Sequence, residues 1–128
     1  MLRLPMSAIP GGLDTERGPP MTLPLRHFLV GLGFLLAGVA LAVVTPVAGY
    51  GAGVAHVHLL LAGWVCLTIL GAMTQFLPVW SGVPLHSRAL GHAQLVLVSA
   101  GVAGLAAAFL TATFWVAVPA GVVAAGGF

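Results

Sequence analysis

Residues 54–79 read VAHVHLLLAGWVCLTILGAMTQFLPV and contain no charged side chain. At a rise of about 1.5 Å per residue, a helix of this length can cross the ~30 Å hydrocarbon core of a bilayer. Two histidines, His56 and His58, interrupt the apolar pattern near its start. The stretch therefore predicts a membrane-crossing helix that carries two imidazoles near one end.

The composition of the whole chain also indicates a membrane protein. Its 128 residues are 60% hydrophobic and 5% charged, whereas a soluble domain of this size needs far more charge on its surface. The net charge of +2 reflects few acids rather than a basic surface, so nucleic acid is not an expected partner. The fold class that follows is all-α, an integral membrane helical bundle in a lipid bilayer.

Three complete spans and an incomplete fourth are predicted in a transmembrane domain that covers residues 25–128. Residues 1–24 are rich in proline and glycine, and we expect a disordered tail there. The fourth segment has no polar flank, so we expect a truncated chain or a piece of a longer protein. The predicted spans are 28–47, 54–79, 92–113 and the incomplete 114–128.

The connections between the spans have turn-forming residues. Residues 49–53, GYGAG, predict a tight turn, and Pro78 followed by Ser81-Gly82 predicts the end of the second span. A cleaved signal peptide is an alternative for the first span, with Arg26 as its positive end.

The arginines indicate an orientation. Arg17 and Arg26 precede the first span and Arg88 lies between the second and third, while the first loop is uncharged. By the positive-inside tendency we expect a multi-pass cell-membrane protein with a cytoplasmic N-terminus. His56 and His58 then lie near the outer face.

Histidines inside a membrane span are costly and usually functional. At about 100° per residue, positions i and i+2 point to nearly opposite sides of a helix, so one metal ion cannot easily bind both. Two flat cofactors, one on each side, fit this spacing, and heme is the leading candidate because imidazole is a common iron ligand. Hydrogen bonding across the bundle is the alternative. Gly63 and Gly71, on the His56 side, suit either helix packing or a cofactor recess.

The remaining histidines, His27, His86 and His92, are expected at the inner end, about 30 Å away. They cannot share an iron with the first pair, and we expect them near the lipid headgroups. Second axial ligands must then come from other helices, another subunit, a homodimer partner or sequence outside this chain. We assign no catalytic residues, because the only carboxylates lie in the tail.

Several residues together resemble the catalytic subunit of the heme-copper oxidases, which include cytochrome oxidases and nitric oxide reductases. They lie between about 54 and 105: Ala55-His-Val-His-Leu59, Gly63-Trp64, Gly71, Phe76-Leu-Pro78, Ser81-Gly82 and His92-Ala-Gln. The resemblance implies that His56 binds a high-spin heme beside copper and His58 a low-spin heme. One span precedes the pair here, and copper would need residues outside this chain.

The expected function is that of a membrane protein that binds b-type or related heme through His56 and His58. It would act in respiratory electron transfer or in the reduction of oxygen or nitric oxide. A non-catalytic heme sensor or carrier is one alternative. A cofactor-free assembly or transport subunit is another.

Overall fold

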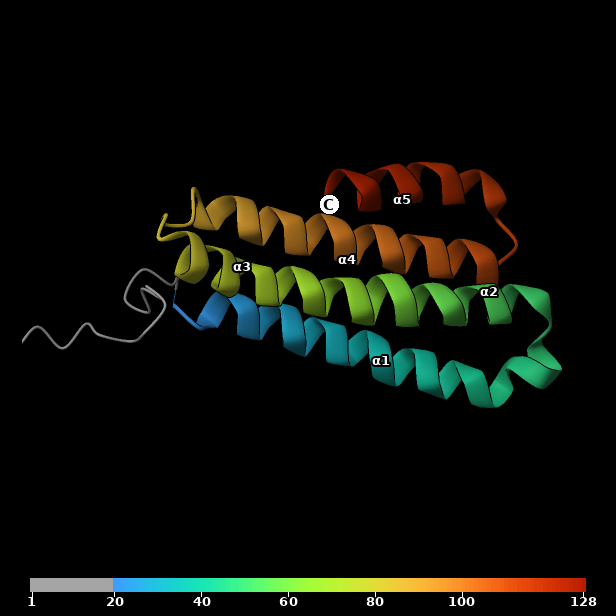
Figure 1. Cartoon of the computed structure of the whole chain (residues 1–128). Coiled ribbons are helices and arrows are strands. Elements are labelled where there is room, and N and C mark those ends of the chain that lie inside the picture. Colours follow the sequence, from blue (N-terminus) through green and yellow to red (C-terminus); the bar gives the residue numbers. More distant parts are fainter. Residues whose placement is uncertain (1–19) are drawn as a thin grey trace, which may run out of the picture.

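The computed structural model describes residues 20–128, and these form a bundle of long antiparallel helices (Figure 1). The second helix is continuous from Tyr50 to Ser81 but contains a π-helical middle, labelled η2. The elements are α1 (Thr22–Ala48), α2 (Tyr50–His58), η2 (Leu59–Cys66), α3 (Leu67–Ser81), α4 (Arg88–Leu110) and α5 (Phe114–Gly126).

The prediction of a membrane helical bundle is confirmed. Three helices in the described part of the chain are long and apolar enough to cross a membrane: Thr22–Val47, Tyr50–Ser81 and Arg88–Leu110. The shorter α5 folds back along α4, where Gly101 lies against Ala124 (Figure 1). It corresponds to the segment predicted as an incomplete span.

Helix α1 begins earlier than the predicted first span, inside the segment assigned to a disordered tail. Leu23 and Pro24 of that segment are buried, while residues 1–19 lie outside the described part of the chain. Proline is tolerated in the first turn of a helix, where its missing N–H has no helical partner. Leu23 in turn packs against Gly91 of α4, so a contact distant in sequence fixes this helix start.

The turn between α1 and α2 is shorter than the turn predicted over residues 49–53. Gly49 alone breaks the helix, with φ 82° and ψ −172°. This backbone region is essentially restricted to glycine. Residues from Tyr50 onward are already helical. The reversal at Gly49 places α2 directly alongside the end of α1.

Close glycine contacts join α1 to the long second helix. A Cβ at Gly63 would lie 2.6 Å from Phe34, and one at Gly71 would lie 2.6 Å from His27 Cβ. These glycines therefore serve helix packing, one of the two roles left open by the sequence. Val65 and Phe76 of the same long helix are exposed.

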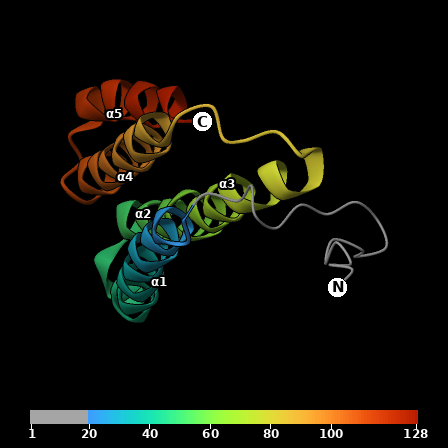
Figure 2. The ribbon, with the colours of Figure 1, turned by 90° about the vertical axis from the view of Figure 1, so that its left-hand side faces the viewer.

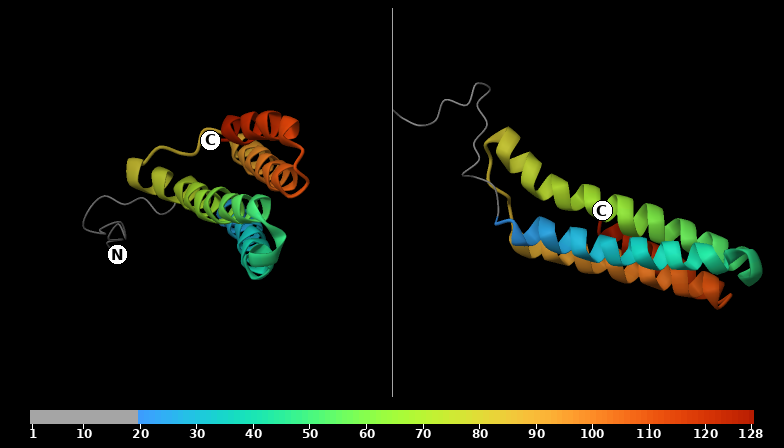
Figure 3. Two further views of the ribbon diagram at one scale, coloured as in Figure 1. Left: turned by 90° about the vertical axis from the view of Figure 1, so that its right-hand side faces the viewer. Right: turned by 90° about the horizontal axis from the view of Figure 1, so that it is seen from below.

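Helix α4 packs on α2 and η2 but diverges from α3. Figures 2 and 3 show the end of α3 turning away from α4 towards the connection that joins them. At the other end, Gly51 of α2 approaches the backbone of Phe109 in α4. The buried core lies between the long second helix and α4, and Phe34 and Leu41 of α1 pack against it. It consists of Ala55, Leu59, Leu67, Leu95, Val98, Val102 and Ala106.

Replacing Gly71 with alanine should destabilise the bundle, because the new methyl group meets His27. We expect Gly71→Ala to lower the free energy of unfolding by about 1–3 kcal/mol, as overpacking does elsewhere. Gly33→Ala is the matched control, since a Cβ there meets nothing within 4 Å. Unfolding in mixed detergent micelles measures both, and equal stability of the two variants would contradict the packing role.

Candidate functional site

The two histidines occupy the last turn of α2, immediately before η2. Here the N–H of Leu59 bonds to the carbonyls of both Ala55 and His56, where the hydrogen-bond register changes. π-Helical segments are rare and are frequent at functional sites. The sequence does not predict η2, because the composition of its residues, LLLAGWVC, also suits an ordinary α-helix.

His56 faces α1. Its Nδ1 lies 2.7 Å from the carbonyl oxygen of Gly38, and the absence of a side chain at Gly38 also lets Leu60 pack closely there. This bond joins two helices that are adjacent only through tertiary packing. It matches the cross-bundle hydrogen bond considered as an alternative to a ligand role.

His58 faces α4. Its Nδ1 lies 2.8 Å from the carbonyl oxygen of Val54, one turn earlier in the same helix. Its ring centroid lies 5.1 Å from that of Phe109. His56 and His58 therefore contact different helices, in agreement with the predicted divergence of the two imidazoles.

These bonds determine which nitrogen of each ring remains free. A carbonyl oxygen only accepts, so Nδ1 must carry the hydrogen and donate it, which leaves Nε2 of the neutral ring with its lone pair. His27 and His92 bond in the same way to the carbonyls of Leu23 and Arg88.

The surroundings of Nε2 distinguish these rings. Arg26 Nη1 donates to Nε2 of His92 at 2.9 Å. Nε2 of His27 is buried and has no hydrogen-bond partner. The ring of His58, in contrast, borders an open cavity.

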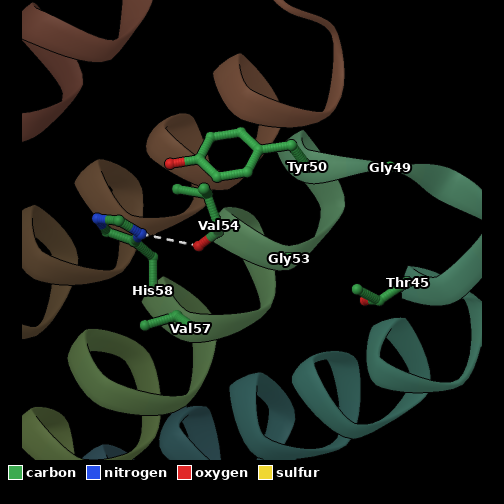
Figure 4. A pocket seen from close by; sticks show the side chains of 7 residues that line it. All are labelled: Thr45, Gly49, Tyr50, Gly53, Val54, Val57 and His58. Atoms are coloured by element: carbon green, nitrogen blue, oxygen red, sulfur yellow. Dashed lines mark hydrogen bonds between the residues drawn. The ribbon is translucent and has the colours of Figure 1, made fainter.

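That cavity has a volume of about 520 Å³, and we call it the outer recess after the orientation expected from the arginines. Ligand pockets typically have volumes of roughly 300–1,000 Å³. Figure 4 shows the phenol of Tyr50 and the imidazole of His58 on the same side of α2. No charged side chain lines the outer recess. Its lining residues are Thr45, Gly49, Tyr50, Gly53, Val54, Val57 and His58.

The other histidines lie at the opposite end of the bundle, as expected, but one differs from its predicted surroundings. His27 is fully buried against Gly71 rather than exposed near headgroups, because that glycine leaves room for the imidazole. His86 is exposed in the connection before α4. Among residues 20–128, no group of three or more His, Cys, Asp or Glu side chains could hold a metal ion.

No protein-family model, curated protein or solved structure shows significant similarity to this chain. The resemblance to heme-copper oxidases thus depends on the quoted motif residues alone and stays a prediction.

Removing each imidazole should affect stability differently. His56→Ala deletes an interhelical hydrogen bond, and we expect the free energy of unfolding to fall by about 0.6 kcal/mol, with an upper bound near 1.7 kcal/mol. His58→Phe, the control, deletes a bond within α2 but keeps an aromatic ring beside Phe109, and it should cost less. Unfolding of the heme-free protein in micelles compares them, and a larger loss for His58→Phe would refute the assignment.

Proposed function

We propose that this protein binds heme through Nε2 of His58 and transfers electrons in a respiratory membrane. The observation that carries the proposal is the bond from His58 Nδ1 to the Val54 carbonyl. Histidines that bind metals almost always donate their other ring hydrogen to a carbonyl, carboxylate or water. The imidazole of His58 also lines the outer recess.

The lining of the outer recess fits a heme. It combines glycines and valines with a single phenol and contains no charge, which suits the apolar body of a porphyrin. When bound, heme supplies the one-electron chemistry. The chain itself would fix the tautomer of His58 through Val54, restrict the ring through Phe109 and exclude water with apolar side chains. Burial of this kind tunes the reduction potential of an iron centre.

We assign His56 a packing role, in place of the high-spin heme that the resemblance implies. The backbone of α1 approaches its ring at Gly38, so a porphyrin on that side would have to separate α1 from α2. The tight contacts at Gly63 and Gly71 oppose such a separation.

Electron transfer is the activity we favour over reduction of a gas. A copper site of the oxidase type needs a cluster of histidines, and residues 20–128 contain no such cluster. Oxygen or nitric oxide reduction would therefore require ligands from beyond the described residues.

We also propose that the end carrying Arg26 and Arg88 is cytoplasmic, by the positive-inside tendency. This orientation places His58 towards the outer face.

The test is a reduced-minus-oxidised absorption spectrum of protein purified from heme-replete cells. We expect heme bands in the wild type, and His58→Ala should abolish them because it removes the iron ligand. His92→Ala, the matched control, should leave them unchanged, since Arg26 already occupies its Nε2. His56→Ala should retain them.

Two results would overturn the proposal. One is a colourless, folded wild-type protein. The other is a spectrum that survives His58→Ala but disappears with His92→Ala. If His56→Ala instead lost half of the heme absorption, the result would support the two-heme arrangement that the resemblance implies.

A further inference from the structure

Arg26 and Arg88 lie at the same end of the bundle and are joined through His92. Arg26 Nη1 donates to Nε2 of His92 at 2.9 Å, and Nδ1 of the same ring donates to the carbonyl of Arg88 at 2.8 Å. His92 therefore connects α1 to the first turn of α4, and both arginines are exposed. We call Arg26, Arg88 and His92 the basic cluster.

The basic cluster has no acidic partner in the part of the chain that the structure describes. Residues 20–128 contain no aspartate or glutamate, and the two acids of the sequence, Asp14 and Glu16, precede them. Figure 1 shows that α1 and α4 both begin at this end. Neither helix has an acidic residue in its first turn, so the positive ends of two helix dipoles add to the charge of the arginines. The guanidinium of Arg26 has five N–H groups in a fork that matches the geometry of a phosphate.

An apolar groove lies between the same two helices. Its volume is about 490 Å³, which is typical of ligand pockets. All of its lining residues are apolar, and a Cβ at Gly33 would meet no atom within 4 Å. We call it the α1–α4 groove. Its lining includes Val30, Gly33 and Ala37 of α1 and Ala103, Ala106 and Leu110 of α4.

The α1–α4 groove continues the faces on which the basic cluster lies. By helical periodicity, positions 26, 30, 33 and 37 share one face of α1, and positions 92, 103, 106 and 110 share one face of α4. Along α1 the lining extends from roughly 6 to 17 Å beyond Arg26. This depth is close to that of one leaflet in a bilayer core about 30 Å thick. On α4 the lining continues deeper, to Leu110.

We propose that an anionic phospholipid binds along this seam, with its phosphate at the basic cluster and an acyl chain in the α1–α4 groove. Basic pockets between transmembrane helices bind anionic headgroups in this way. A zwitterionic lipid carries no net charge, whereas an anionic lipid brings a negative charge for the two arginines to neutralise. The α1–α4 groove and the outer recess share no residue, so this site is independent of the proposed heme.

Native mass spectrometry of the full chain in detergent tests the headgroup. Dioleoyl phosphatidylglycerol and dioleoyl phosphatidylcholine are titrated separately, and we expect the wild type to prefer the anionic lipid. Arg26→Gln should lower this preference about fivefold, which is the typical effect of one arginine near the membrane surface. The glutamine amide can still donate to His92. Arg88→Gln should have a similar effect.

Arg26→Lys is the matched control for the charge. It replaces the guanidinium by an ammonium group, which also binds phosphate, and should keep most of the preference. Equal affinity of the wild type for the two lipids would overturn the proposal. A preference that survives both glutamine substitutions would also overturn it.

Filling the α1–α4 groove tests the position of the acyl chain. Gly33→Leu should cause loss of both bound lipids while leaving the ratio of their affinities unchanged, because the groove contacts the chain and not the headgroup. Gly126→Leu is the matched control, since it adds the same side chain at an equally open position on α5. It should bind both lipids as the wild type does.

Other occupants give different results. If Gly33→Leu kept its lipid but changed from a dimer to a monomer, the α1–α4 groove would hold a second copy of the chain and the lipid proposal would be wrong. If inorganic phosphate displaced phosphatidylglycerol and Gly33→Leu had no effect, the basic cluster would bind anions without an acyl chain. That result would overturn the proposed lipid site.

Discussion

A backbone carbonyl accepts the Nδ1 hydrogen of four histidines in this bundle, and the candidate site depends on that constraint. In hydrocarbon an unpaired N–H is costly, so each ring takes the nearest acceptor. For His27, His58 and His92 that acceptor lies one turn earlier in the same helix. The bond orients each ring along its helix and leaves Nε2 as the nitrogen available for another partner.

These three histidines make the same local hydrogen bond, but tertiary packing gives the free nitrogen of each ring different surroundings. Arg26 on the neighbouring helix occupies the free nitrogen of His92. Gly71 admits His27 into the contact between α1 and α3 and buries it. His58 borders the outer recess, where Gly49 and Gly53 also form part of the lining. What distinguishes a ligand candidate here is therefore the space around the ring rather than its own hydrogen bond.

The sequence predicted those features that depend on local pattern. Apolar run lengths located the membrane spans, and the two-residue spacing placed His56 and His58 on different sides of one helix. Features that depend on distant contacts were missed. The start of α1 requires Leu23 to pack on Gly91, and the burial of His27 requires Gly71 opposite it. Likewise, nothing in the local composition of η2 distinguishes π-helical from α-helical hydrogen bonding.

Among residues 20–128, the charged side chains lie at one end of the bundle. At the end with Arg26 and Arg88, hydrogen bonds such as Arg26 to His92 tie α1 to α4 within one chain. In the same described residues, the end with His58 has no charged side chain, so its helices are held together by close packing and by a few polar groups, such as His56 bonded to the carbonyl of Gly38. An imidazole nitrogen that already has its tautomer fixed is the most directional of these groups.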